Sequence, residues 1–502
     1  MFKYATFAAT LFLAPGLADP TCQLRTIRLP FGNCSFSALG NDSYVHSTGI
    51  LLGVGSIDSV CGMASTVVNS TLIQSRDVCS GDELTLTSGS TRVKMTAAQC
   101  RSRRGGYVDR DDLTAASSNQ LSSLSQLNPG WVELTSNDTK TPFKYAVDTE
   151  LRIQDQSVTM VQGLISQGQQ HTMSHIGLAE SSTLLQSLKS DDLIAARSWG
   201  LDAGSQSFAA PRNGSLVLGG YDASSFEGGW FSYDIPKSNL VRERSCPLQV
   251  QITEIKLTAQ VGRNKPSVEW PVAGGLPLIA CIEPYDNQFR FPTPILDTVK
   301  RMLGNDNDLI DASAYPDLYN LEPGLVYDAS SNISFSMTIT IEDGLKVEIP
   351  SYELARPLRG LDQDGVPVVN SSLTEVQVFA EEGPLEGPVL GKVFLSQVYL
   401  FVNHENSTFS LARQNQGQTF LDVKSSGKCP SAPSLTKSDK GLIAVGVVLG
   451  VLIIGLLCYV AYRCWKAPLA KVHDPEIKEN ERPGSLNDLV VPPSPRRSVE
   501  EH

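Results

Sequence analysis

The feature that most restricts the folds open to this chain is an uncharged apolar run near its C-terminus. Gly441–Tyr462 contains no acidic or basic residue. At about 1.5 Å per helical residue, such a run crosses the ~30 Å hydrocarbon core of a bilayer. Arg463 and Lys466 follow it, which favours a cytosolic C-terminus. We therefore predict one transmembrane helix over 441–462. The polar, proline-rich residues 463–502 are predicted to form a disordered cytosolic tail.

A second targeting signal lies at the N-terminus. Lys3 precedes the mostly apolar run Ala5–Leu13, and small residues follow that run. This order is typical of a signal peptide, and we predict that residues 1–18 are removed on export. Together the two signals predict a single-pass type I protein of the secretory pathway, in the plasma membrane or an endomembrane, with its N-terminus outside or lumenal.

Two kinds of extracellular chemistry agree with this topology. Eight cysteines precede the apolar run, and an even number in an oxidising compartment predicts disulfides. Cys246 and Cys281 form a candidate pair, although spacing alone leaves the connectivity open. Eight sequons for N-linked glycans also precede the run: Asn33, Asn41, Asn69, Asn137, Asn213, Asn332, Asn370 and Asn406.

The region between the two signals has a β pattern. The 502 residues include 40 glycines and 29 prolines, which favours many turns. Short runs rich in β-branched and aromatic residues alternate with those turns. Expected strands lie at Ser215–Gly219, Leu248–Ile255, Ser334–Ile341 and Val398–Val402, and expected helices at Ser182–Leu188 and Pro294–Leu303. Gln414–Lys440, rich in Ser, Gly, Lys and Gln, is predicted to be a stalk.

The charge balance excludes some partners. The formal net charge is -12, which argues against a nucleic-acid partner. The six histidines have no metal-ligand spacing, so we predict neither a metal nor another cofactor. The oligomeric state stays open.

Five segments, in order along the chain, carry a family resemblance. They are Gly177–Leu188, Arg197–Leu201, Asn213–Asp222, Cys246–Ile255 and Leu390–Tyr399. In this order they resemble the pepsin-like aspartic proteases, in the pattern of the membrane-anchored fungal type. The resemblance implies a mainly β, bilobal pepsin-like fold beside the transmembrane helix and the tail, with an N-terminal lobe over 19–237 and a C-terminal lobe over 238–413.

The residues that the family needs for catalysis are missing. In that family each lobe contributes an Asp-Thr/Ser-Gly loop, and the two carboxylates share a proton and activate water. Neither triplet occurs in this chain. The equivalent of the first aspartate is Ser65 or Thr66, depending on the register, and Val67 or Val68 replaces the glycine. The equivalent of the second is Glu283, followed by Pro284 and Tyr285, with Asp286 as the nearest alternative acid.

These substitutions favour a binding function over catalysis. A hydroxyl cannot share a proton as a second carboxyl does, so we expect a catalytically inactive ectodomain. It would bind a peptide, protein or glycan in its cleft, or act in surface sensing. The alternatives are an active aspartic endopeptidase that uses Glu283 with an unrecognised acid, and a structural spacer glycoprotein. A glycan on Asn69 would crowd the cleft, whereas a buried position would leave that sequon empty.

Overall fold

The alternation of side chains along single strands explains why this sequence forms sheets. In β19 (Phe335–Ile341) Phe335, Met337, Ile339 and Ile341 are buried, and the residues between them are partly exposed. A period of two places alternate side chains on opposite faces of a strand, so this segment can cover a core with one face. The strands expected near 215–219, 248–255 and 398–402 also form.

The structure is a computed structural model, and it describes most of the chain between residues 25 and 427. Within that range it leaves out 38–43, 56–57, 80–83, 89–90, 110–112, 116, 128–144, 166–172, 237–245, 260–267, 273, 305–308, 311–323, 332–333, 381–386 and 418–420. After 427 it describes 455–460, 462–463 and 466. The predicted signal peptide and nearly all of the predicted tail lie outside the described residues.

The largest sheet has twelve strands and contains both the first strand, β1, and the late strands β25 and β26. Its order is β13-β26-β25-β10-β11-β1-β2-β3-β9-β4-β8-β7. Its strands are β1 (Ile27–Ser37), β2 (Tyr44–Val54), β3 (Asp58–Ser65), β4 (Leu72–Gln74), β7 (Tyr145–Ile153), β8 (Gln156–Ile165), β9 (Ser174–Gly177), β10 (Ser198–Asp202), β11 (Gly214–Leu218), β13 (Phe226–Asp234), β25 (Val398–Asn403) and β26 (Thr408–Gln414).

A second sheet has eight strands, in the order β20-β19-β14-β16-β24-β17-β23, with β15 paired to β14. Its strands besides β19 are β14 (Gln249–Ala259), β15 (Val268–Pro271), β16 (Leu278–Ile282), β17 (Phe289–Phe291), β20 (Lys346–Ile349), β23 (Val378–Ala380) and β24 (Val389–Leu390). Three smaller sheets pair β18 (Leu325–Asp328), β22 (Pro367–Val376) and β21 (Ala355–Leu361); β12 (Gly220–Asp222) and β27 (Val423–Ser425); and β5 (Leu84–Ser88) and β6 (Thr91–Met95).

Short helices pack against strands of these sheets, and the caps of two of the helices are visible in the sequence. The helices are α1 (Ala97–Arg103), α2 (Ser118–Leu127), α4 (Thr183–Ser190), α5 (Thr293–Leu303), α6 (Ser351–Leu354) and α7 (Lys392–Leu395). Thr96 and Gln99 form a capping box at the start of α1. Ser182 caps α4, whose Leu184, Leu185 and Leu188 are buried. The two expected helices therefore form as α4 and α5.

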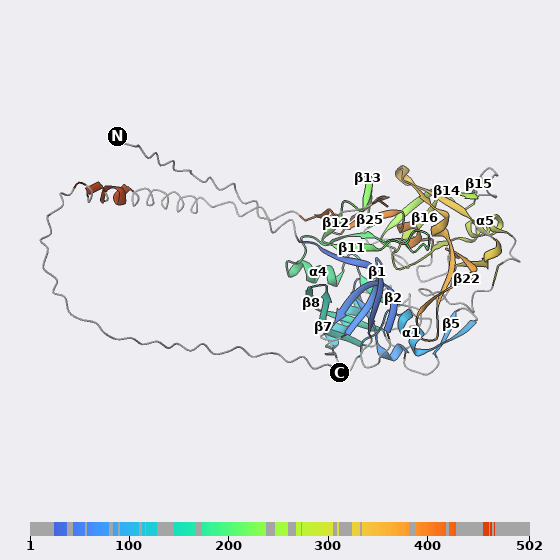
Figure 1. Ribbon diagram of the computed structural model, residues 1–502, viewed down its shortest axis with the longest axis horizontal. Coiled ribbons are helices and arrows are strands. Elements are labelled where there is room, and N and C mark those ends of the chain that lie inside the picture. The colour runs from blue at the N-terminus through green and yellow to red at the C-terminus, as the bar shows by residue number, and fades with distance from the viewer. Residues whose placement is uncertain are drawn as a thin grey trace, which may run out of the picture. The chain divides into compact units, whose positions relative to one another are not determined.

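The last strands of the body return to the first sheet. β25 pairs with β10 at Trp199–Val402, and β26 pairs with β13. Figure 1 shows the orange β25 among the green strands β11 and β13. β27, within the predicted stalk, pairs with β12. The chain up to Cys429 consequently forms one compact unit, and the residues from Pro430 onward form another.

The predicted fold class is wrong as stated. The described chain is mainly β, but the structure has no helix among its described residues that is long and apolar enough to cross a membrane. Of the predicted span 441–462, only 455–460 and Tyr462 are described, and these residues are helical. The rest of the predicted span lies outside the described residues.

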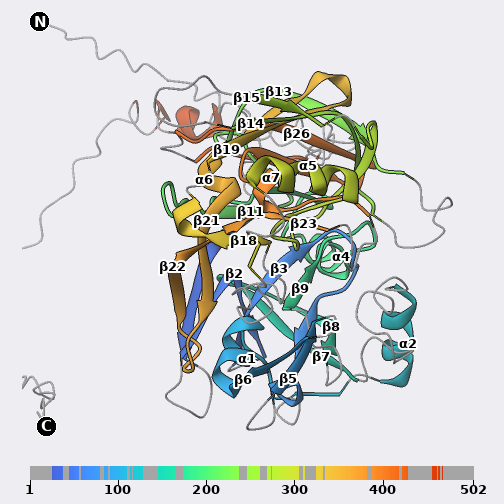
Figure 2. The same cartoon turned by 90° about the vertical axis from the view of Figure 1, so that its right-hand side faces the viewer.

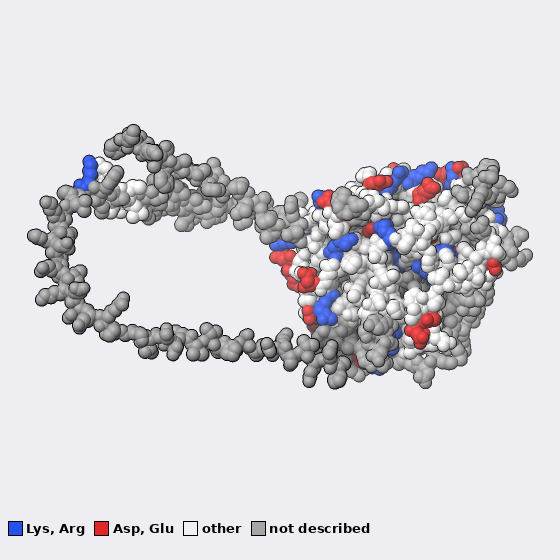
Figure 3. All heavy atoms as spheres, viewed as in Figure 1, with Lys and Arg blue, Asp and Glu red and all other residues white. Residues whose placement is uncertain are grey.

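Charge on the visible surface is mixed in sign. On the face shown in Figure 3, acidic and basic side chains are interspersed among uncharged ones. A nucleic-acid interface needs basic residues gathered in a patch or stripe. That face has no such patch among the residues that are coloured.

Candidate functional site

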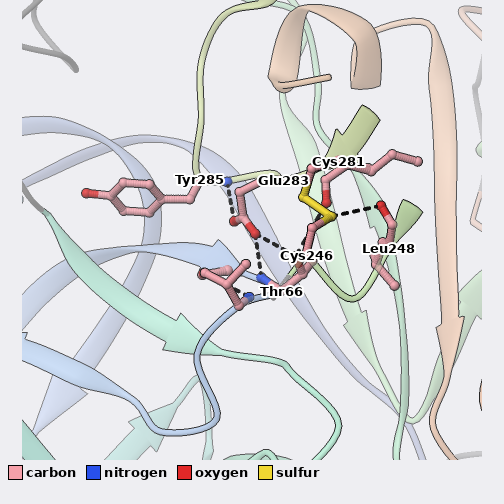
Figure 4. Close-up of a disulfide and its surroundings, with 9 residues drawn as sticks. Thr66, Cys246, Leu248, Cys281, Glu283 and Tyr285 are labelled. Atoms are coloured by element: carbon pink, nitrogen blue, oxygen red, sulfur yellow. Dashed lines mark hydrogen bonds between the residues drawn. A yellow bond between two sulfur atoms is a disulfide. The ribbon is translucent and has the colours of Figure 1, made fainter. Parts of the chain in front are cut away.

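The two loops singled out in the sequence meet in the interior of the described body. Ser65 ends β3, and Glu283 follows β16 directly. Although they are 217 residues apart in the chain, Thr66 and Glu283 share two hydrogen bonds. The Thr66 amide donates to Glu283 Oε2 at 3.0 Å, and the Thr66 hydroxyl donates to the same oxygen at 2.5 Å. Figure 4 shows both contacts.

Backbone pairing fixes the first loop. Ser65 lies opposite Gly177 of the parallel strand β9, and the Leu178 amide donates to the Ser65 carbonyl at 3.0 Å. A Cβ at Gly177 would lie 2.6 Å from the Ser70 backbone, so only glycine fits this close approach. Strand β9 therefore holds Ser65 and Thr66 in place from one side.

A disulfide and a backbone hydrogen bond hold the second loop, which carries Glu283, in place. The structure forms the disulfide between Cys246 and Cys281 that the sequence proposes, two residues before Glu283. The Glu283 amide donates to the Leu390 carbonyl at 3.3 Å, which attaches the loop to β24. Figure 4 shows this disulfide beside the Thr66–Glu283 pair. The carboxyl of Glu283 is therefore presented by a segment tied to two neighbouring segments.

Glu283 is surrounded by donors and not by another acid. Besides the two Thr66 donors, the Tyr285 amide donates to Glu283 Oε1 at 2.9 Å, and the Ser65 hydroxyl also favours the ionised form. A carboxylate has about four acceptor positions. Three are filled, and Ser65 competes for the fourth, so little capacity remains to bind and activate a water.

Burial controls the protonation of this carboxyl. Glu283 is only 2 % exposed. Desolvation raises the pKa of Glu283 to about 7, although the surrounding donors act in the opposite direction. The group consequently loses its proton near neutral pH, as a single site.

The alternative acid, Asp286, is engaged elsewhere. Its Oδ2 accepts from Arg290 Nε at 2.5 Å, and its Oδ1 accepts from the Gln288 amide at 3.1 Å. Among the residues that the structure describes, no carboxyl group hydrogen-bonds to Glu283. Both sequence registers therefore lead to the same chemistry, with one carboxyl and two hydroxyls, and the Thr66 hydroxyl contacts the carboxyl directly.

Tyr285 occupies the position where the resemblance expects glycine, and its side chain makes a contact that the sequence reasoning missed. The Met173 amide donates to the Tyr285 hydroxyl at 2.7 Å, and the ring meets His175 edge-on with centroids 4.1 Å apart. Figure 4 shows the phenol pointing away from Glu283. Burial raises the pKa of Tyr285 and lowers the pKa of His175 to about 3, so both groups are neutral. The signal in the sequence was a bulky residue in a glycine position.

Three disulfides confirm the prediction that the cysteines pair. They are Cys34–Cys61, Cys79–Cys100 and Cys246–Cys281. Cys22 and Cys429 lie outside the described residues. Among the residues that are described, no cluster of His, Cys, Asp and Glu side chains is placed to hold a metal ion.

The described sequons differ in accessibility. Asn33, Asn213 and Asn406 are exposed. Asn69 is partly buried, and its Oδ1 accepts from the Ser181 amide at 2.8 Å, so a glycan there would compete with an internal hydrogen bond. In Asn370 the Oδ1 accepts from the Ser372 hydroxyl at 2.6 Å. Asn41, Asn137 and Asn332 lie outside the described residues.

Comparison of the chain with protein-family models and with curated proteins finds no match.

Proposed function

We propose that this chain is a non-catalytic binding protein of the secretory pathway, related to the pepsin-like aspartic proteases. The observation that carries the proposal is the surroundings of Glu283. A single buried carboxyl is hydrogen-bonded to Thr66 and to the Tyr285 amide, where the peptidase reaction requires two carboxyls. The disulfides and the exposed sequons support passage through an oxidising, glycosylating compartment.

The chemistry argues against water activation at this site. A general base must accept a proton from a water within hydrogen-bond reach. The acceptor positions of Glu283 are taken by fixed donors, and Thr66 has no acidic proton to return to a leaving amine. Loss of one partner of a cooperative catalytic pair costs on the order of 10³-fold or more in rate. The ligand class that suits a peptidase-related site is an extended peptide or a protein loop.

The decisive test compares cleavage and binding in one preparation. Full-length protein would be incubated with a diverse peptide library from acidic to neutral pH, with Glu283→Gln as the matched control, and cleaved and retained peptides would be identified by mass spectrometry. We expect retention of peptides without cleavage above the control. Cleavage that disappears in Glu283→Gln would overturn the proposal and show that an acid outside the described residues completes an active endopeptidase site.

A further inference from the structure

A groove with a volume of about 590 Å³ lies apart from the Thr66–Glu283 pair. Its walls are β1 with β2, the loop that precedes β11, and the first half of β22. Neither Thr66, Glu283 nor Tyr285 lines it. Its size lies within the range of about 300–1,000 Å³ that is typical of ligand sites.

The groove exists because a hairpin from late in the chain is anchored beside early strands. At the tip of β21–β22, the Gln363 carbonyl accepts from the Thr96 hydroxyl at 2.7 Å, and the Leu361 carbonyl accepts from Gln99 at 3.1 Å. Gly365 has φ +76°, and a Cβ there would lie 2.5 Å from the Ala98 carbonyl oxygen. Figure 2 shows β22 descending beside the blue strands and α1. These contacts hold the wall of the groove in place.

One wall of the groove is apolar and exposed. Phe208 is 47 % exposed, Val368 42 % and Val369 48 %. Exposed apolar side chains gathered in one concave surface are typical of a binding site. The apolar wall therefore favours a ligand that carries aliphatic or aromatic groups.

The charged groups of the groove are of one sign. Arg212 and Arg359 line it, and none of the described lining residues is acidic, although the chain as a whole is acidic. Asp202 pairs with Arg212 from behind, so part of that charge is balanced. Arg212 Nη2 and Gln206 Nε2 are buried donors with no acceptor among the described residues. The two arginines of the lining favour a ligand that carries negative charge.

Within the part of the chain that the structure describes, the strands that flank the groove have edges without a strand partner. β1 pairs with β11 over Ile27–Phe31 and with β2 over Gly32–Ser37, so each half has one described partner. β22 pairs only with β21 over Pro367–Asn370 in the described pairings. Open edges of this kind accept an added strand through main-chain hydrogen bonds. An extended peptide therefore fits the backbone of the groove as well as its side chains.

We infer that this groove binds an extended peptide segment in which acidic residues alternate with apolar ones. The apolar side chains pack on Phe208, Val368 and Val369, and the carboxylates face Arg359 and Arg212. Alternate side chains of a strand point to opposite sides, so such a peptide satisfies both walls at once.

The test compares the binding of an acidic peptide with that of an uncharged one. The probe is a fluorescent octapeptide of alternating valine and aspartate, and the comparison peptide replaces aspartate with asparagine. Because Asn33 and Asn213 line the groove and are candidate glycan acceptors, binding to the full-length protein is measured by fluorescence polarisation after removal of N-linked glycans. We expect the acidic peptide to bind about tenfold or more tightly than the amide peptide, with the difference shrinking at high salt.

The pair of variants Val369→Glu and Val369→Lys distinguishes an effect of charge on binding from a loss of folding, because both place a long polar side chain at the same position. Val369→Glu should weaken the acidic peptide about tenfold, whereas Val369→Lys should retain or strengthen it. Val366→Glu is the matched control, because Val366 is 40 % exposed on the same hairpin but does not line the groove. Glu283→Gln should leave this binding unchanged, which separates the inference from the proposed function. Equal effects of Val369→Glu and Val369→Lys, equal binding of both peptides, or no binding of either would overturn it.

Discussion

Two buried glutamates in this molecule have different kinds of hydrogen-bond partner. Glu375 is fully buried and faces a positive charge, since Arg356 Nε donates to its Oε2 at 3.1 Å. The Gln288 side chain and the Gly324 amide donate to its other oxygen. Glu283 is almost as buried but has only neutral donors. Burial alone therefore does not define a functional carboxyl, because these two similarly buried groups have different partners.

The largest effect should come from breaking the ion pair at Glu375. Arg356→Met removes the cation that contacts Glu375 and leaves this carboxyl in the interior without that partner. Such a loss costs about 3–5 kcal/mol of the free energy of unfolding. Urea unfolding followed by tryptophan fluorescence would measure it.

The control for that variant is an exposed pair. Lys424 contacts Asp422 at 2.7 Å, with side chains 52 % and 43 % exposed. Lys424→Met should leave the unfolding midpoint unchanged, because solvent screens exposed pairs. If the two variants lost equal stability, the distinction between buried and exposed pairs would be wrong for this protein.

The next largest effect is the change that Glu283 causes in the free energy of unfolding as the pH changes. The pKa of this carboxyl is about 7 in the folded chain, compared with an ordinary value of 4.5. Between these values the unfolded chain releases a proton that the folded chain keeps, so stability falls as pH rises through this window. The difference of about 2.5 pH units corresponds to about 3 kcal/mol.

The measurement must separate Glu283 from buried histidines. His175, with its pKa lowered to about 3, and His404, at about 4, stabilise the folded chain more as pH rises, which is the opposite trend. Urea unfolding of the wild type and of Glu283→Gln over this pH range isolates the carboxyl, because the histidines contribute equally to both. The stability of the wild type relative to the variant should decline with pH. A constant difference would show that Glu283 keeps an ordinary pKa.

The sequence identified the positions of this site better than its interactions. Resemblance pointed to Ser65 or Thr66 and to Glu283, and the structure places Thr66 against that carboxyl. It could not decide between the two hydroxyls, because that choice depends on how β3 and β16 approach one another. The contact of Tyr285 with Met173 and His175 was also missed, since a side chain in a glycine position can be directed only by its surroundings.

In the fold as well, local elements could be predicted from the sequence, whereas long-range pairings could not. The strand expected at Ser334–Ile341 forms as β19 and the helix expected at Ser182–Leu188 forms as α4, because the runs that predict them are local. The return of β25 and β26 to the first sheet and the docking of the β21–β22 tip on α1 join residues more than 160 apart. No local pattern encodes such pairings, so the groove beside β22 was not foreseen. Hydropathy over 441–462 predicted a spanning helix that the described residues do not contain.

The smallest expected effect is the loss of stability when Glu283 loses one of its neutral hydrogen-bond donors. Thr66→Val keeps the shape of the side chain but removes the hydroxyl that donates to Oε2 at 2.5 Å, while the backbone donor at 3.0 Å remains. A hydrogen bond to a charged group contributes about 1.5–3 kcal/mol, and one to a neutral group about 0.5–1.5 kcal/mol. The cost should therefore be larger above pH 7, where Glu283 is ionised, than at pH 5, and the pKa of Glu283 should rise further. Urea unfolding at both pH values checks this, with Ser65→Ala as the control that removes the neighbouring hydroxyl. A cost that is the same at both pH values would mean that Thr66 only fills space, and that Glu283 is governed by burial alone.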